Sequence, residues 1–202
     1  MDIASRIQTI LDAEAKAIRA INVDDSFERA LNAMKSSSGK VITTGMGKAG
    51  YVARRFAATL ASTATPAFFI HPSEAAHGDL GHVEDGDCII AFSTSGKTRE
   101  VLEFIEMARH INASGAVIGI TSHPDSGLRE LVDIVLDMGV IEEPCPLGLT
   151  PSASIAAMSA ISDALTLTLM EMKGVTKQDY GVRHHGGYLG RKARLANTGE
   201  DE

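Results

Sequence analysis

A cluster of hydroxyl-bearing residues with one glycine occupies Ser93–Thr98 (STSGKT), between an apolar run and a helical pattern. The N-terminus of a helix presents unpaired N–H groups and the positive end of the helix dipole, which together suit a phosphate group. A single hydroxyl, from Ser95 or Thr98, would be enough to cap the helix, and capping is the simpler alternative. Because the segment offers several hydroxyls, we predict that it binds phosphate.

Two further segments combine small or polar residues with a strand-to-helix junction. Thr44–Gly50 (TGMGKAG) lets a ligand approach the backbone and offers the charge of Lys48, although a tight turn explains the glycines equally well; it lacks the P-loop spacing. Leu147–Ser154 (LGLTPSAS) is rich in hydroxyls at a helix start, where an N-cap followed by proline is the simpler explanation.

A metal site is the alternative for the histidines near the middle of the chain. His71, Glu74 and His77 have the spacing H-x-x-E-x-x-H, which differs from the H-E-x-x-H zinc motif. Pro72 keeps His71 from sharing a helical face with the others. We therefore expect no required metal and no cofactor.

The elements that must position these segments follow from hydrophobic periodicity. Short β-rich runs alternate with helical patterns after residue 39. Strands are expected at 41–44, 67–70, 88–92, 116–121 and 134–138, and helices near 2–21, 25–35, 48–62, 98–110, 126–131 and 152–173. Thr176 and Asp179 have the spacing of a capping box and predict a last short helix.

This alternation predicts an α/β fold, a three-layer αβα sandwich whose central sheet is mostly parallel and doubly wound. In such sheets ligands bind where the carboxyl ends of the strands meet the following helices. We divide the chain into a helical arm at 1–36, part of the same domain, a main unit at 37–192, and a polar, disordered tail at 193–202. The amphipathic first helix either packs on its own sheet or, as we expect, contacts a second subunit.

Composition limits the classes of function. The net charge of −7 argues against a general surface for nucleic acid or for an anionic membrane. Cys88 and Cys145 lie far apart without C-x-x-C spacing, as in reduced proteins. We find no apolar run of the roughly 18 residues that spans a bilayer and no signal-peptide pattern, and we expect a cytoplasmic protein.

Several strings together make the chain resemble a known family. They are GMGK at 45–48, HPSEAAHGDLG at 71–81, SxSG at 93–96, CPLGLTP at 145–151 and GGYLGR at 186–191. In these strings the chain resembles sugar isomerase (SIS) domains, and among them the arabinose-5-phosphate isomerases, in a single-domain form without the paired CBS domains that many members carry. The chain departs from the family pattern at His185, where a proline is common, and at Lys97 and Arg99.

The resemblance implies an isomerase that interconverts D-ribulose 5-phosphate and D-arabinose 5-phosphate, with a phosphorylated sugar as its partner and a homotetramer as its usual assembly. It also implies that neighbouring subunits complete each site. The implied phosphate- or substrate-binding residues are Gly47, Ser93, Ser95, Gly96, Thr98 and Ser152. The implied catalytic residues are Lys48, His77, Glu100, Glu143 and His184.

Aldose–ketose isomerisation moves a proton between C1 and C2 through an enediol, so it needs a base, an acid and a group that stabilises negative charge. Histidine and a tuned glutamate titrate in the required range. We assign ring opening or C–H proton transfer to His184, with one glutamate as the alternate base. The alternatives are an isomerase of another ketose phosphate, such as a hexulose 6-phosphate, a phosphosugar-binding regulator without catalysis, and a scaffold that has lost its ligand.

Overall fold

The computed structural model describes residues 1–195, with side chains described as far as residue 193. Its strands are β1 (Val41–Gly45), β2 (Ala67–Ile70), β3 (Cys88–Phe92), β4 (Val117–Thr121) and β5 (Ile134–Asp137). Its helices are α1 (Ile3–Arg19), α2 (Asp25–Ser36), α3 (Gly47–Ser62), α4 (Pro72–Ala75), the 3₁₀ turn η1 (Asp79–His82), α5 (Arg99–Ile111), α6 (Gly127–Leu131), α7 (Ala153–Met172), α8 (Lys177–Arg183) and α9 (Gly187–Leu195).

The five strands form one sheet in the order β2-β1-β3-β4-β5, and every neighbouring pair is parallel. The prediction of a mostly parallel sheet is thus confirmed, and each predicted strand lies within one residue of its observed bounds. After β1 the chain builds β2 on one side, and it then returns to place β3 on the other side of β1. This reversal at β1 and β3 creates the switch point where open parallel sheets bind ligands.

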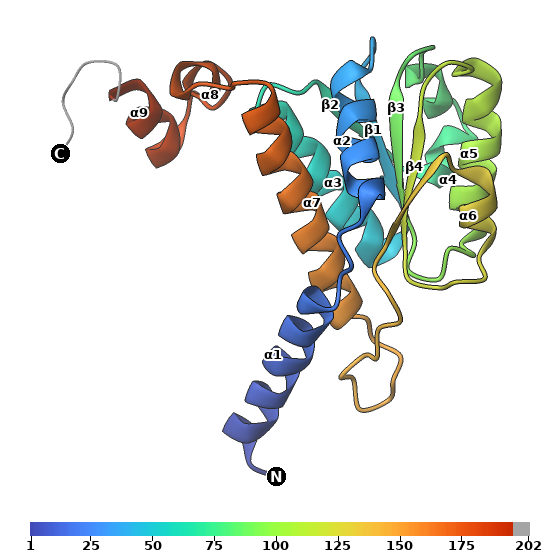
Figure 1. Cartoon of the computed structure of the whole chain (residues 1–202), viewed down its shortest axis with the longest axis vertical. Helices are drawn as coiled ribbons and strands as arrows, with labels where there is room; N and C mark the ends of the chain where they lie inside the picture. Colours follow the sequence, from blue (N-terminus) through green and yellow to red (C-terminus); the bar gives the residue numbers. More distant parts are fainter. Residues whose placement is uncertain (196–202) are drawn as a thin grey trace.

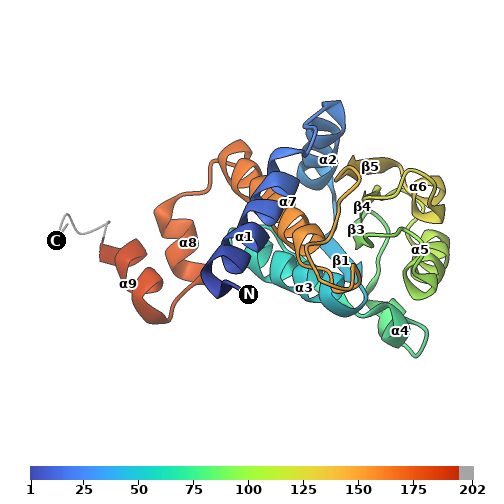
Figure 2. The same ribbon diagram turned by 90° about the horizontal axis from the view of Figure 1, so that it is seen from below.

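Helices cover both faces of the sheet (Figures 1 and 2). On one face α2, α3 and α7 bury an aliphatic core with Val41 and Ile90 of the sheet, and Phe56 packs edge-on against Phe92 with ring centroids 6.0 Å apart. On the other face, buried residues of α4, α5 and α6 pack in one cluster with Ile42 of β1. Strands that are buried on both faces have continuous apolar sequences. These short apolar runs could therefore be distinguished in the sequence from the helical patterns between them.

Two helical segments extend from this sandwich (Figure 1). The first, α1, packs against α7 rather than on the sheet, and Ala17 is its one buried residue. Its apolar residues Ile3, Ile7 and Leu11 remain more than half exposed, at 68%, 54% and 54%. The other is the α8–α9 pair, which follows the C-terminal end of α7. The capping box of Thr176 and Asp179 starts α8 as predicted.

The prediction of a polar, disordered tail is wrong for residues 193–195, because α9 runs from Gly187 to Leu195. Its sequence, GYLGRKARL, has two glycines and three charges, so helical periodicity did not reveal it. The rest of the predicted tail, 196–202, lies outside the described residues.

Helix α7 carries a mean hydropathy of 1.4 over its most apolar 18-residue window, which is enough in length and composition to cross a membrane. Our expectation that no segment reaches this threshold is therefore wrong. Half of that window is buried inside the protein. Buried residues of α7 such as Met158 and Leu165 pack into the core beneath the sheet, as in a core helix.

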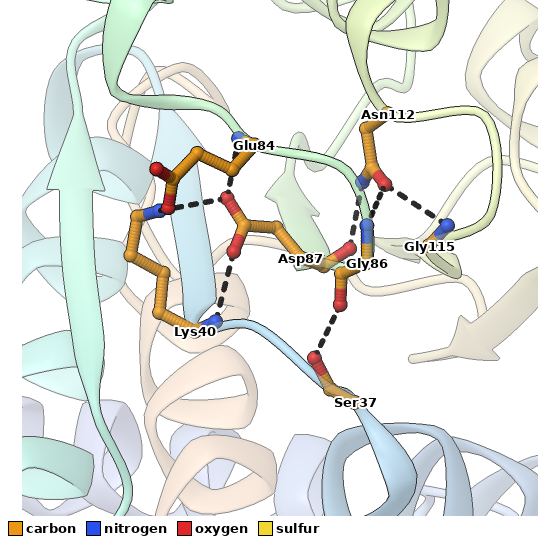
Figure 3. Close-up of polar contacts among 7 residues, drawn as sticks. All are labelled: Ser37, Lys40, Glu84, Gly86, Asp87, Asn112 and Gly115. Carbon is orange, nitrogen blue, oxygen red and sulfur yellow. Dashed lines mark hydrogen bonds and ion pairs between the residues drawn. The ribbon is translucent and has the colours of Figure 1, made fainter.

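A network of buried polar contacts joins the connections at the amino ends of the strands (Figure 3). The Asp87 side chain is fully buried, and its carboxylate accepts hydrogen bonds from Lys40 N at 2.8 Å and Glu84 N at 2.8 Å. Lys40 Nζ lies 3.0 Å from Asp87 Oδ2 and 2.9 Å from Glu84 Oε2. The buried charge is therefore both paired and hydrogen-bonded, as a stable buried carboxylate requires.

The same network reaches the connection before β4. Asn112 Nδ2 donates to the Asp87 carbonyl at 2.7 Å, and Asn112 Oδ1 accepts from Gly86 N at 3.0 Å and Gly115 N at 2.9 Å. Ser37 Oγ donates to the Gly86 carbonyl at 2.7 Å. Three connections that are distant in sequence are thereby fixed at one edge of the sheet (Figure 3).

Candidate active site

A pocket of about 360 Å³ opens at the carboxyl ends of β1, β3 and β4, at the edge opposite the buried network. Four connections contribute to it: the turns after β1, β3 and β4, and the long connection between β5 and α7. Its lining residues are Met46, Lys48, Ala49, Phe92, Ser93, Thr94, Ser95, Thr98, His123, Glu143, Leu149, Pro151, Ser154 and Ile155. Five of the predicted site residues therefore meet here: Lys48, Ser93, Ser95, Thr98 and Glu143.

The turn after β3 is held in shape by its own hydroxyls. Ser93 Oγ lies 2.9 Å from Thr98 Oγ1 and accepts from Gly96 N at 3.0 Å, and Ser95 Oγ accepts from Lys97 N at 3.2 Å. Thr98 is the N-cap residue of α5, yet its side chain makes no capping hydrogen bond. The simpler explanation, that these hydroxyls serve to cap the helix, is therefore not supported for Thr98.

Two glycines allow these turns to pack closely. Gly96 has φ +60°, and a Cβ there would lie 2.3 Å from Ser126 Oγ. A Cβ at Gly50 would lie 2.4 Å from the Gly45 carbonyl, so the turn after β1 needs this glycine to join β1 to α3. Neither Gly96 nor Gly47 lines the pocket, although their neighbours in sequence do. Lys48, in the first turn of α3, is exposed and borders the pocket.

The side chain of Glu143 lies against the N-terminal end of α7. Its Oε2 accepts from Ser152 N at 2.7 Å and Ala153 N at 2.8 Å, and its Oε1 accepts from Ser154 N at 3.2 Å and from the Ser154 hydroxyl. Partial burial raises the pKa of this carboxyl, but the hydrogen bonds from Ser152 and Ser154 outweigh burial and hold the pKa below its ordinary value. Glu143 thus remains ionised and fixed beside the pocket.

The hydroxyl of Ser152 is free of the capping role that its position suggested. Ser152 is the N-cap residue of α7, but the N–H of Ser154, from which its side chain could accept, donates to the Glu143 carboxylate instead. Within the described part of the chain its buried Oγ has no hydrogen-bond partner. Ser152 does not itself line the pocket, and it lies between Pro151 and Ser154, which do.

The remaining predicted catalytic residues lie outside the pocket lining. His77 is exposed just after α4, and Glu100 is half-buried in the first turn of α5, and both segments follow the carboxyl end of a strand, β2 for His77 and β3 for Glu100. His184 is far from them, at the C-terminal end of α8, where its ring stacks on Tyr180 with centroids 5.3 Å apart. Its neighbour Arg183 borders a hollow with Lys40 and thus lies near the amino ends of the strands.

Sequence reasoning missed three polar residues of the pocket: Thr94, His123 and Ser154. Thr94 and Ser154 lie within hydroxyl-rich segments that were singled out as segments. His123 had no local signal, since His123-Pro124-Asp125-Ser126 has the composition of an ordinary surface turn.

A thiol with a lowered pKa, that of Cys145, lies on the same connection as Glu143. Hydrogen bonding from the N–H of Thr150, with smaller contributions from Leu147 and Leu149, lowers the pKa of Cys145 to about 6. Burial raises the pKa of Cys88 to about 12. Both cysteines are free.

Across residues 1–195, no group of three or more His, Cys, Asp or Glu side chains is arranged to hold a metal ion.

An all-parallel αβα sandwich with a hydroxyl-rich turn at a helix N-terminus, next to the topological switch point, places the chain in the class of doubly wound α/β domains. Within this class, the family model of the SIS domain matches residues 35–169. The chain belongs to the SIS-domain family.

Curated relatives include arabinose 5-phosphate isomerase KdsD of Pseudomonas aeruginosa, 36% identical over 96% of this chain, and KdsD of Escherichia coli K12, 42% identical over 86% of it. The chain spans 60% and 52% of the lengths of these two relatives. Among solved structures, a Bacteroides fragilis protein assigned as a phosphosugar isomerase involved in capsule formation has a TM-score of 0.89 and 41% identity, covering 92% of this chain and 99% of its own. An Escherichia coli CFT073 protein in complex with arabinose 5-phosphate has a TM-score of 0.86 and 36% identity, covering 91% and 97%.

Proposed function

We propose that this protein is an aldose–ketose isomerase that interconverts D-ribulose 5-phosphate and D-arabinose 5-phosphate. The observation that carries the proposal is the meeting of a hydroxyl-rich, helix-initiating turn with Lys48 and Glu143 in one pocket. The names of the KdsD relatives and the arabinose 5-phosphate complex of a related structure support the choice of substrate. The anionic substrate would sit on N–H and hydroxyl groups, so the net charge of −7 is no obstacle.

In the reaction, a base removes a proton from C1 of the ketose, and the electron pair forms the enediol while the carbonyl oxygen at C2 gains a proton. Delivery of a proton to C2 and loss of the hydroxyl proton at O1 then give the aldose. Ser93, Ser95 and Thr98 would hold the phosphoryl end of the sugar. Gly96 would shape the same turn, and Gly47 and Ser152 would contribute from the neighbouring connections after β1 and before α7. Lys48 would stabilise the negative charge that develops on oxygen.

The hydrogen bonds of Glu143 argue against this residue as the base that transfers the proton between C1 and C2. A carboxylate that accepts four hydrogen bonds and has a lowered pKa is a weak base. We therefore assign Glu143 an electrostatic and positioning role, and we seek the proton-transfer base among His77, Glu100 and His184.

His184 would reach a pocket only from a neighbouring subunit, because within its own chain it lies near the opposite edge of the sheet. We accordingly propose a homotetramer in which the exposed apolar residues of α1 and the α8–α9 pair make subunit contacts. We further propose that the protein works in the cytoplasm, where its two free cysteines stay reduced and phosphosugars are available.

The substrate is tested by an isomerase assay of the purified protein over a panel of pentulose and hexulose phosphates. We expect the highest kcat/KM for the ribulose 5-phosphate and arabinose 5-phosphate pair. Preference for a hexulose 6-phosphate would replace the substrate, and tight binding without turnover of any member would point to a regulator.

The shared site is tested by complementation between inactive variants. We expect Lys48→Ala and His184→Ala each to lose activity, and mixed oligomers obtained by co-expression to regain about a quarter of wild-type activity, because that share of sites draws both intact residues from two subunits. His110→Ala, an exposed histidine at the far end of α5, is the control and should behave as wild type. A mixture that stays inactive would contradict the shared site.

A further inference from the structure

The turn after β4 brings one more ionisable group to the pocket, the imidazole of His123. The side chain is exposed and borders the same space as Ser93, Ser95 and Thr98. No sequence pattern pointed to it, and the proposed chemistry does not use it.

The backbone around His123 is tightly held. The His123 carbonyl accepts from Arg129 Nε at 2.7 Å, and Arg129 Nη2 in turn donates to Asp137 Oδ2 at 2.7 Å. Ser122 N donates to the Thr94 carbonyl at 3.0 Å, which joins this turn directly to the hydroxyl-rich turn. The position of His123 relative to Ser93–Thr98 is therefore fixed by the fold, whereas in the described chain its ring makes no hydrogen bond or ion pair. A fixed backbone carrying an unengaged polar side chain into a pocket is a preorganised arrangement for a ligand.

The charges of the side chains that line the pocket indicate which part of the substrate the His123 ring would contact. Among the described residues, the pocket lining contains two side chains that can carry positive charge, Lys48 after β1 and His123 after β4. Glu143 adds a fixed negative charge next to α7. If Lys48 serves the reacting oxygens, the phosphoryl group at Ser93–Thr98 would otherwise meet only neutral donors. An imidazole N–H to a phosphoryl oxygen supplies a charge-assisted hydrogen bond, which is stronger than a neutral one.

We infer that His123 binds the phosphoryl group of the substrate and is a determinant of specificity for phosphorylated sugars. The inference rests on the proposed function for the identity of the sugar, but for the phosphoryl group it rests on the pocket alone. Because the ring acts on a part of the substrate that does not react, its loss should weaken binding of substrate and transition state alike.

The test compares H123A, H123R and the control H110A. For H123A we expect the Kd for inorganic phosphate, measured by calorimetry, and the KM for the sugar phosphate to rise about tenfold. We expect kcat to stay within about twofold, because uniform binding does not change the chemical step. H123R, which restores a cationic donor, should recover most of the affinity, and H110A should match the wild type.

Each outcome bears on a different claim. Wild-type phosphate affinity in H123A, a loss of kcat without a change in KM, or an H123R that binds as weakly as H123A would each overturn the inference. If the wild type turns over no sugar phosphate, the proposed function fails. A tenfold weaker phosphate affinity in H123A would still support the inference in that case.

Discussion

Glu143 gives the sharpest prediction, because it caps α7 and borders the pocket at once. Glu143→Ala removes the acceptor for three backbone N–H groups and for the Ser154 hydroxyl. Loss of an N-cap acceptor costs typically about 1 kcal/mol, and loss of a negative charge at a helix N-terminus costs up to about 1 kcal/mol more. We therefore expect the free energy of unfolding to fall by about 2 kcal/mol, equivalent to a decrease in Tm of roughly 4–8 °C for a domain of this size.

The contribution should depend on pH in a defined direction. Since the pKa of Glu143 is lower in the folded protein than in the unfolded chain, its stabilisation is fully present above the unfolded value of about 4.3 and is lost as the pH falls through the folded value. The difference in unfolding free energy between wild type and Glu143→Ala should accordingly be largest at neutral pH and shrink as the pH falls below the unfolded value.

Urea unfolding followed by circular dichroism at neutral and acidic pH, at one protein concentration, measures both effects. Glu142→Ala is the matched control, because Glu142 is exposed one residue away and should change stability by less than about 0.5 kcal/mol. Equal unfolding midpoints for wild type and Glu143→Ala at neutral pH would refute the capping role. So would a difference that does not shrink on acidification.

Two further predictions concern the buried network and the thiol of Cys145. Asp87→Asn turns an NH₂ group toward the N–H and ammonium donors of Lys40, and we expect it to lower the free energy of unfolding in urea by about 3 kcal/mol. The control is Glu84→Gln, at an exposed partner of Lys40, which should lower it by less than about 1 kcal/mol. Similar losses in the two variants would contradict the role of the network. Cys145 should react with iodoacetamide at a rate that rises through a pH of about 6, as judged by mass spectrometry of the modified peptide, while Cys88, with a pKa of about 12, stays unmodified in the folded protein. A rate that rises only above pH values of about 8 would show that the N–H groups near Cys145 do not stabilise its thiolate.

Most of the fold was predictable because its signals are local. The apolar run Cys88–Phe92 is doubly covered, and its observed bounds are those expected from the sequence. Helix α4 escaped prediction because four residues, Pro72–Ala75, are too few to show a helical period. The hydroxyl-rich turn could be singled out for the same local reason, since the hydroxyls of Ser93–Thr98 lie close together in the sequence, and the structure places Ser93, Ser95 and Thr98 in the lining of one pocket.

Features that depend on distant contacts could not be predicted in this way. Glu143 caps a helix whose first N–H groups lie 9 to 11 residues further on, so the usual capping pattern of adjacent residues does not reveal it. His123 enters the pocket only because β4 lies next to β3 in the sheet. The family resemblance placed His184 among the predicted site residues. Its position near the amino ends of the strands of its own subunit is not indicated by any spacing in the sequence.

The separation between the two edges of the sheet has a consequence for how this protein can change. Lys40, Asp87 and Asn112 secure the crossovers at one rim, while the side chains that line the pocket lie on turns at the other. Amino-acid replacements in the turns after β1, β3 and β4 can therefore alter ligand preference while the rim that secures the crossovers stays intact. A library randomised at Thr94 and His123 should consequently yield mostly folded members, which makes this scaffold a practical starting point for directed evolution toward other phosphorylated sugars.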